Sequence, residues 1–449
     1  MTTRVIIVRH GQSTYNAQKR IQGRCDESVL TEKGRREALR VGEALGGVAS
    51  SAPSPIAALY HSPLQRAAQT AEIIAQHLQL TCACIPSPQL LEVDLPLWEG
   101  LSREEVQSQS PAAYQQWHDQ PSEFSMMVNG QPHYPVRSLY AQTENFWQTL
   151  LPAHQGETVL IVAHNGINRC LIMSALGMDP SRYQSIQQSN CCINILNFSG
   201  GWGDPVQAES LNQLSHMGII LPSFRPPHNQ LRILLVRHGE TDWNREGRFQ
   251  GIQDIPLNDN GRHQASKAAD YLKTVQIDAA VSSPMLRPKE TAEIILQHHP
   301  GVELALEPQF CEIGHGLWEG KLEKEIEAAY PGLLAQWKTA PETVQMPEGE
   351  NLQQVWDRVM TAWDEMVERY SRGEAKTLLV VAHDAVNKCI LCGLLGLKPQ
   401  DIWAIKQGNG AVTVIDYPQG AGSAPIVQTL NLTTYLGSGI FDKTAAGAL

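Results

Sequence analysis

Continuous apolar runs of about five residues recur along the chain, separated by amphipathic stretches. RVIIV at 4–8, IAALYHS at 56–62 and TVLIVAH at 158–164 are rich in β-branched or aromatic residues, which predicts strands. TEKGRREALRVGEAL at 31–45 and LQRAAQTAEIIAQHL at 64–78 carry apolar side chains at helical spacing, which predicts helices. Because strands that are apolar throughout are buried on both faces, we expect mainly parallel sheets covered by helices on both sides.

The same pattern occurs twice in the chain. RHGQSTYN at 9–16 follows the apolar run VIIV, and RHGETDWN at 237–244 follows ILLV. His10 and His238 are 228 residues apart, and the spacing of later matching pairs falls only to 219. A drift this small indicates two equivalent domains that differ by a few loop deletions.

The repeat sets the expected domain boundaries. A chain of 449 residues is too long for one compact core, so two α/β domains are expected, at residues 1–217 and 231–436. The segment between them, GIILPSFRPPHNQ at 218–230, is rich in proline and predicts a semi-rigid linker. Residues 437–449 are expected to form a frayed tail or part of a lid.

Composition narrows the classes of function. A formal net charge of −11 argues against general binding of nucleic acid, which depends on an excess of Lys and Arg. No apolar run approaches the roughly 18 residues of a membrane span, and the chain passes directly from Met-Thr-Thr-Arg into a strand. These features predict a cytoplasmic protein without a cleaved targeting segment. The nine cysteines lack the second Cys/His pair of a zinc site, so we expect reduced core thiols and no metal.

The first RHG lies where an open α/β sheet binds ligands, beyond the carboxyl end of a strand. Arg9 offers a planar fork of donors, His10 an imidazole nitrogen, and Gly11 a close approach of the backbone. A phosphate group suits this combination of donors.

Further residues with suitable chemistry follow at other element ends. Arg66 opens a helix after the strand end HSPL, Glu92 lies in LLEVDLPLWEG, and His164 ends the strand LIVAH. Their recurrence at matching places argues against coincidence. The corresponding residues of the second half are Arg237, His238, Arg287, Glu312 and His383.

Taken together, these motifs resemble the histidine phosphatase superfamily, also called the phosphoglycerate mutase-like family, over nearly the whole chain. The shared motifs are RHG-x4-N, QG-x2-D, S-P-L-x-R-A, the Glu before W-E-G and the late A-H. The resemblance implies a three-layer α/β/α sandwich in each domain and a phosphohistidine mechanism. It also implies small anionic sugar phosphates as substrates, no cofactor, and a monomer or homodimer.

The chemistry of phosphate monoesters suggests a role for each residue. Neutral imidazole is a good nucleophile near pH 7, so His10 and His238 would attack phosphorus. Glu92 and Glu312 would protonate the departing alkoxide, and the apolar neighbours LL-V-L around Glu92 favour its protonated form. The remaining residues would stabilise the phosphoryl oxygens: Arg9, Asn16, Arg66 and His164 in the first half, and Arg237, Asn244, Arg287 and His383 in the second.

Two of these roles have alternatives. Asp94 is a rival acid because it lies two residues after Glu92, although the second half has Gly314 at that position. Asn16 has the alternative role of forming a turn.

The halves differ most in the segment after Trp-Glu-Gly. The second half has PEGENLQQVWDRV, which is close to the superfamily pattern, whereas the first half has NGQPHYPVRSLYAQ. His133, Tyr134 and Arg137 would place hydrogen-bond donors and a carboxylate-binding fork over the phosphate pocket. The alternative is that PHYPVR is only a proline-fixed turn before a helix.

Residues 1 to 200 are also similar to the plant phosphatases of 2-carboxy-D-arabinitol 1-phosphate, an inhibitor of Rubisco. RHGQSTYN, RIQGRCDESVLTEKG, PHYPVR and LIVAHN with the later QSNC carry this similarity. It implies the same substrate here, whose carboxylate Arg137 would bind, and a photosynthetic prokaryotic source.

Several alternatives remain at this stage. A mutase would use the same phosphohistidine but return the phosphoryl group to a second hydroxyl, and a regulator would bind sugar phosphates without turnover. The phosphatase could also act on another phosphorylated metabolite. Because the second half keeps the motif residues, we expect a second competent site rather than a half that is only structural.

Overall fold

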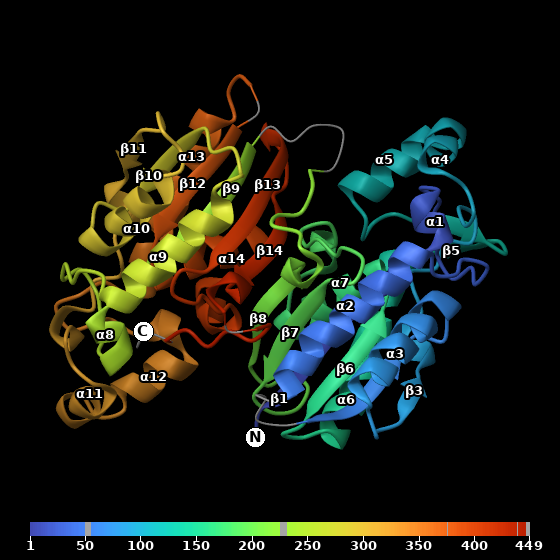
Figure 1. The fold of residues 1–449 in the computed structure, drawn as a ribbon, viewed down its shortest axis with the longest axis horizontal. Helices are drawn as coiled ribbons and strands as arrows, with labels where there is room; N and C mark the ends of the chain where they lie inside the picture. The colour runs from blue at the N-terminus through green and yellow to red at the C-terminus, as the bar shows by residue number, and fades with distance from the viewer. Residues whose placement is uncertain (50–54, 225–230, 375, 438, 446–449) are drawn as a thin grey trace. The chain divides into compact units, whose positions relative to one another are not determined.

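The computed structural model describes residues 1–49, 55–224, 231–374, 376–437 and 439–445. Two compact units comprise residues 1–219 and 220–449 (Figure 1). Residues 225–230 of the predicted linker and 446–449 of the predicted tail lie outside the described residues.

The first unit is built on a six-stranded sheet in the order β8-β7-β1-β6-β2-β3. The strands are β1 (Thr3–Arg9), β2 (Ile56–His61), β3 (Cys84–Pro86), β6 (Thr158–Ala163), β7 (Ile193–Phe198) and β8 (Val206–Gln213). Neighbouring strands from β1 to β3 pair in parallel, whereas β7 and β8 pair antiparallel at the other edge. The prediction of mainly parallel sheets is confirmed, but the antiparallel hairpin was not foreseen.

Helices cover both faces of this sheet. The chain runs from β1 through α2 to β2 and from β2 through α3 to β3, so right-handed crossovers place α2 and α3 on one face and α6 and α7 on the other (Figure 1). Thr31 accepts the backbone N–H of Gly34 at 3.1 Å and so caps α2. The helices are α1 (Thr14–Ala17), α2 (Glu32–Ala49), α3 (Gln65–Leu78), α4 (Arg103–Gln109), α5 (Pro111–Asp119), α6 (Pro135–Ala153) and α7 (Asn165–Leu176). A short hairpin, β4 (Met126–Val128) and β5 (Gln131–His133), precedes α6.

The second unit repeats this architecture. Its sheet has the order β11-β10-β12-β9-β13-β14, parallel from β11 to β9 and antiparallel at β13 and β14. The strands are β9 (Leu231–Arg237), β10 (Ala279–Ser282), β11 (Leu304–Leu306), β12 (Lys376–Ala382), β13 (Val412–Ala421) and β14 (Ile426–Leu432). The helices are α8 (Asp242–Glu246), α9 (Asp259–Leu272), α10 (Leu286–Leu296), α11 (Glu323–Ala329), α12 (Leu333–Thr339), α13 (Leu352–Tyr370) and α14 (Asp384–Leu395).

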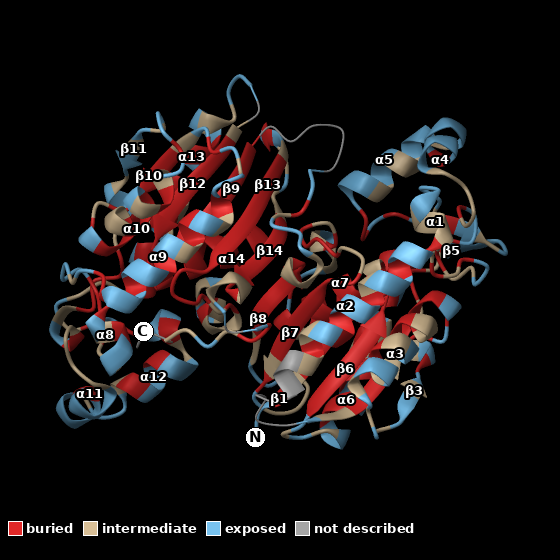
Figure 2. Cartoon of the chain, viewed as in Figure 1, coloured by how far each residue is buried: buried red, intermediate tan, exposed pale blue. Residues whose placement is uncertain are grey.

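Burial follows the apolar runs that predicted the strands. Every residue of β6 and β9 is buried, and Figure 2 shows the central strands of both sheets as buried throughout. Among the helices that the structure describes, none has the length and apolar character needed to cross a membrane.

Part of the predicted tail is attached to the second unit. Asp442 lies 3.5 Å from the ammonium of Lys406 and accepts a hydrogen bond from Asn431 at 3.2 Å. Thr444 accepts the backbone N–H of Asn409 at 3.1 Å. These polar contacts hold residues 442–444 beside the loop that follows α14, in a segment that was expected to be a frayed tail or part of a lid.

Close backbone contact fixes the loop after β1 against α2. A Cβ at Gly34 would lie 2.1 Å from the backbone oxygen of Gln12. Because the nearest atom is backbone and cannot rotate away, we expect Gly34→Ala to lower the free energy of unfolding by roughly 3 kcal/mol. Gly46→Ala in the same helix is the control, since its Cβ would meet nothing closer than 3.5 Å and should change stability by about 1 kcal/mol or less, in the stabilising direction. Equal denaturant midpoints for the two variants would contradict this argument.

His315 is a buried imidazole at the position that Leu95 occupies in the first unit. Neither ring nitrogen has a hydrogen-bond partner among the described residues, and burial lowers the pKa of His315 to about 3. The unfolded chain binds the proton of this imidazole near pH 6.5, whereas the folded chain binds it only near pH 3. The free energy of unfolding is therefore unaffected by this group above pH 6.5 and falls as the pH is lowered from 6.5 to 3. The loss is on the order of 3–5 kcal/mol.

We therefore expect His315→Leu to raise the free energy of unfolding by about 1–2 kcal/mol at pH 7, and by more as the pH falls. Urea titrations of both proteins at pH 7 and pH 5 measure the difference. A variant that is no more stable than the wild type at either pH would show that the buried imidazole does not destabilise the protein.

Candidate functional site

Parallel pairing of β1 and β6 brings the two histidines of the first unit together. Arg9 is opposite Ala163 at the strand ends, and the backbone N–H of His10 donates to the oxygen of Ala163 at 2.9 Å. His164 is the N-cap of α7. Both imidazoles are buried, and their ring centroids lie 5.1 Å apart.

The ring of His10 is oriented by its own loop. Nδ1 lies 2.7 Å from the backbone oxygen of Gly11. A carbonyl can only accept, so Nδ1 carries the proton and Nε2 keeps its lone pair. Burial, and after it the cations of Arg66 and Arg9, hold the pKa of His10 well below its ordinary value of 6.5. The imidazole is therefore neutral near pH 7 and has a nucleophilic nitrogen available.

Buried polar atoms without a protein partner lie close to the ring of His10. Arg66 donates to the backbone oxygens of Cys25 and Gly23 at 2.8 and 2.9 Å, which fixes its guanidinium. Among the described residues, Nε of Arg9, Nε of Arg66 and both ring nitrogens of His164 have no partner. Unsatisfied buried donors are costly, and an anion with several oxygens would satisfy them together.

Asn16 lies close by and makes structural contacts. Its side-chain oxygen accepts the backbone N–H of Ser13 at 3.2 Å and a hydrogen bond from Asn190 at 3.1 Å. Ser13 and Asn16 form the capping box of α1. The alternative of a turn-stabilising Asn therefore has direct support.

Glu92 and Asp94 point to different surroundings. The carboxylate of Glu92 is buried and accepts the backbone N–H groups of Gly166 and Ile167, each at 3.0 Å, at the start of α7 beside His164. Asp94 is one-third exposed and lies 3.6 Å from His133. The geometry therefore favours Glu92 as the acid near the two histidines.

The three residues expected over the pocket have other contacts. His133 contacts the backbone oxygen of Asp94 at 3.1 Å. Arg137 donates to both carboxylate oxygens of Glu123 at 2.5 Å and lies 5.0 Å from the ring centroid of Tyr134. No contact that the structure describes joins this trio to the histidine pair. Because the Arg137 ion pair is half exposed, it is weak enough to exchange partners.

Sequence reasoning missed Arg169, a buried cation on α7. Its guanidinium donates to Gln184 at 2.8 Å and stacks 5.3 Å from the ring centroid of Tyr183, while Nε has no partner within the described residues. The repeat contained a usable signal, because a basic residue follows the late histidine by five positions in both halves, as Arg169 and Lys388.

The second unit reproduces the arrangement. Nδ1 of His238 lies 2.7 Å from the oxygen of Gly239, and its ring centroid lies 5.2 Å from that of His383. Arg287 donates to the oxygens of Gly251 and Gln253 and also from Nε to Nε2 of His238 at 3.3 Å. Asn244 repeats the capping box of Asn16, and Arg237 donates to the oxygen of Gln407 at 2.6 Å as Arg9 does to that of Gln188.

Glu312 differs from Glu92 in its environment. It accepts the backbone N–H of Ala385 at 3.3 Å, and Asp384 precedes that residue where the first unit has Asn165. Burial, and after it the carboxylate of Asp384, raises the pKa of Glu312 above its ordinary value of 4.5. A raised pKa suits a group that has to donate a proton. Across the residues that the structure describes, no group of three or more His, Cys, Asp or Glu side chains could hold a metal ion.

Comparison with known proteins agrees with this duplicated geometry. A family model described as the histidine phosphatase superfamily, branch 1, matches residues 5–208 and again residues 233–430. The chain is 33% identical over 449 residues to a 2-carboxy-D-arabinitol-1-phosphatase of Triticum aestivum, covering 97% of this chain and 86% of that protein. It is 28% identical over 448 residues to a probable 2-carboxy-D-arabinitol-1-phosphatase of Arabidopsis thaliana, covering 97% and 88%.

A shorter relative matches one half of the chain. Phosphoserine phosphatase 1 of Hydrogenobacter thermophilus is 31% identical over 207 residues, which cover 46% of this chain and 95% of that protein. The matched domain therefore occurs as a separate protein elsewhere and twice here. With both halves matched, the chain belongs to branch 1 of the histidine phosphatase superfamily and is a phosphoric monoester hydrolase.

Proposed function

We propose that the first unit hydrolyses 2-carboxy-D-arabinitol 1-phosphate through a phosphohistidine at His10, which would relieve inhibition of Rubisco. The observation that carries the proposal is the similarity to the wheat enzyme over 97% of this chain. The buried donors around His10 support a phosphate ligand but do not distinguish between its esters.

The positions of the side chains support a mechanism in two steps. Nε2 of His10 attacks phosphorus while the bond to the ester oxygen breaks, and Glu92 gives its proton to the leaving alkoxide. Arg9, Arg66 and His164 stabilise the charge on the three remaining oxygens. Glu92, now a carboxylate, takes a proton from water as the water attacks the phosphohistidine, which releases phosphate and restores the neutral imidazole.

The carboxylate of this substrate gives Arg137 a function. We infer that Arg137 exchanges the exposed carboxylate of Glu123 for that of the substrate. The exchange costs little free energy, because a surface ion pair contributes only about 0–1 kcal/mol to stability. Arg137→Ala should raise the Michaelis constant for the carboxylated ester and leave that for ribulose 1,5-bisphosphate unchanged. An equal effect on both esters, or none on either, would show that Arg137 does not recognise the carboxylate.

The test of the function is phosphate release from a panel of esters. It contains 2-carboxyarabinitol 1-phosphate, ribulose and xylulose bisphosphates and 3-phosphoglycerate, and it compares wild type, His10→Ala and His238→Ala. We expect the carboxyarabinitol activity to disappear only with His10→Ala, while the second unit retains activity on another ester. Dependence on a bisphosphorylated primer would instead identify a mutase, and binding without phosphate release would identify a regulator.

A further inference from the structure

The two units surround matching phosphate pockets with different charge. We propose that the second unit takes a phosphate monoester whose organic part is apolar and carries no further negative charge. This rests on the proposal that both units hydrolyse phosphate esters. Two differences between the halves carry it independently: an extra buried carboxylate, and apolar in place of polar side chains at two positions beside the phosphate arginine.

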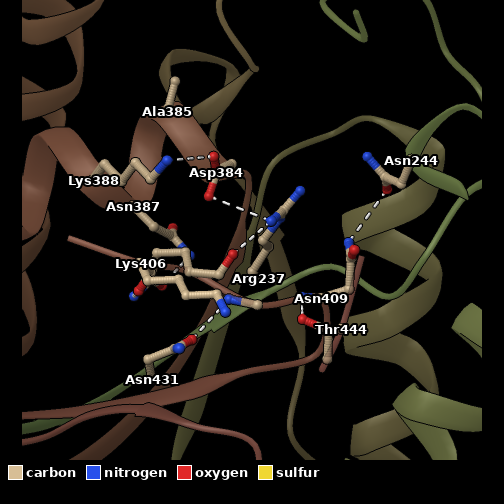
Figure 3. A network of polar contacts seen from close by, with 12 residues as sticks. Arg237, Asn244, Asp384, Ala385, Asn387, Lys388, Lys406, Asn409, Asn431 and Thr444 are labelled. Carbon is tan, nitrogen blue, oxygen red and sulfur yellow. Dashed lines mark hydrogen bonds and ion pairs between the residues drawn. The ribbon is translucent and has the colours of Figure 1, made fainter. Parts of the chain in front are cut away.

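The extra carboxylate is Asp384, at the position of Asn165. It is buried, accepts a hydrogen bond from the ammonium of Lys388 at 2.8 Å, and lies 3.4 Å from Nη1 of Arg237 (Figure 3). It therefore neutralises charge that the second pocket could offer to a ligand. In the first unit, no carboxylate within the described residues forms an ion pair with either Arg9 or Arg169, so both cations remain available.

A neighbouring pair of positions differs between the halves in a way that conserves net charge. The backbone N–H of Gln12 donates to the carboxylate of Glu37 at 2.8 Å, and the backbone N–H of Glu240 donates to the amide oxygen of Gln264 at 2.8 Å. The amide and the carboxylate have exchanged places, so each unit keeps one negative charge there. Asp384 has no such exchange, because the two cations that it contacts, Arg237 and Lys388, correspond to Arg9 and Arg169 in the first unit.

The second difference lies next to the phosphate arginine. Arg287 binds the backbone oxygens of Gly251 and Gln253, and the residue between them is Ile252, whose side chain is 61% exposed. Leu286 precedes Arg287 and is 49% exposed. At these two positions the first unit has the polar residues Arg24 and Gln65.

Arg24, at the position of Ile252, contacts the loop that carries Glu92 in the first unit. Its guanidinium donates to the backbone oxygen of Glu92 at 3.1 Å and forms no ion pair among the described residues, whereas Arg358, which donates to the corresponding oxygen of Glu312 at 3.2 Å, is paired with the carboxylate of Glu350 at 2.8 Å. Exposed apolar side chains beside a polar pocket favour an apolar ligand group, whereas a cation favours a carboxylate. Both differences therefore change the second pocket in the same direction, away from multiply charged substrates.

The test uses three esters with primary alkoxide leaving groups: 3-phosphoglycerate, glycerol 3-phosphate and n-butyl phosphate. Phosphate release by the His10→Ala chain reports the second unit, and we expect kcat/KM to be highest for n-butyl phosphate and lowest for 3-phosphoglycerate. Asp384→Asn in this background should raise kcat/KM for 3-phosphoglycerate relative to n-butyl phosphate about tenfold, since it removes a like charge near the substrate. Ile252→Arg should change the ratio in the same direction.

The first unit offers the matched control. In the His238→Ala chain, Asn165→Asp and Arg24→Ile should each lower the ratio. Loss of folding would lower kcat/KM for all three esters equally and leave the ratio unchanged, so the ratio isolates selectivity. A ratio within about twofold of the parent in Asp384→Asn and Ile252→Arg, with the n-butyl phosphate activity retained, would overturn the inference.

Binding separates this inference from failure of the proposed function. If the His10→Ala chain releases no phosphate from any ester, the second unit is not a phosphatase. Calorimetric titration of 3-phosphoglycerate into His10→Ala/His238→Ala, with and without Asp384→Asn, then decides the charge effect, because the first unit contributes equally to both. Tighter binding with Asp384→Asn supports the inference, and unchanged binding rejects it.

Discussion

Replacing His10 by alanine is expected to lower kcat for the ester of the first unit by about 10⁴-fold or more, because the covalent route through phosphohistidine disappears. The buried donors of Arg9, Arg66 and His164 remain, so substrate should still bind and the Michaelis constant should change little. Rapid-quench experiments with ³²P-labelled substrate should show an acid-labile phosphoenzyme in the wild type and none at this site in the variant.

The matched variant is His238→Ala, whose ring has the same 2.7 Å contact with the following glycine. It should lose a different activity, that on the esters of the second unit. If both variants lost the same activity in proportion, the units would not be independent sites. If His10→Ala retained more than about a tenth of the wild-type rate, a direct attack by water would replace the phosphohistidine mechanism.

The second large effect is expected from Glu92→Gln. Glutamine keeps the size of the side chain but cannot protonate the alkoxide, so kcat for an alkyl ester should fall about 10²- to 10⁴-fold. The burst of 4-nitrophenol from 4-nitrophenyl phosphate, which reports phosphoryl transfer to His10, should slow much less because this leaving group needs no proton, whereas hydrolysis of the phosphohistidine, which also uses Glu92, should slow for every ester. This dependence on the leaving group distinguishes loss of an acid from loss of structure.

Asp94→Asn provides the control for the acid. Asp94 is partly exposed and faces His133, so its substitution should not create a dependence on the leaving group. If Asp94→Asn rather than Glu92→Gln slowed only the alkyl ester, the assignment of the acid would be reversed. The same comparison can be made in the second unit with Glu312→Gln, where Gly314 leaves no rival.

Much of the fold was predictable because its signals are local and repeated. Apolar runs such as 158–163 are buried at every position, and the amphipathic stretch at 31–45 begins at the capping Thr31. The hairpin of β7 and β8 escaped prediction because an antiparallel edge has no crossover helix to mark it. The contact of Asp442 was not predicted, because its partner Lys406 is distant in sequence and no local pattern links the two residues.

The candidate phosphate residues were predicted from the repeat, since recurrence at matching element ends selects them without any distances. The spacing of residues along the chain does not show where a side chain points in the folded protein. Glu92 and Asp94 are two residues apart, yet only the fold shows that Glu92 binds the start of α7 while Asp94 faces His133. Arg137 likewise has the chemistry to bind a carboxylate, but its partner Glu123 becomes evident only after folding.

The sequence by itself therefore determined the duplication, the α/β class and the candidate phosphate-binding side chains, because each depends on residue type and spacing along the chain. Only the tertiary structure decided which charges remain available. Arg9 and Arg169 form no ion pair with a carboxylate among the described residues, whereas Asp384 pairs with both Arg237 and Lys388. Charge balance depends on distances between residues far apart in sequence, and those distances exist only once the strands have paired.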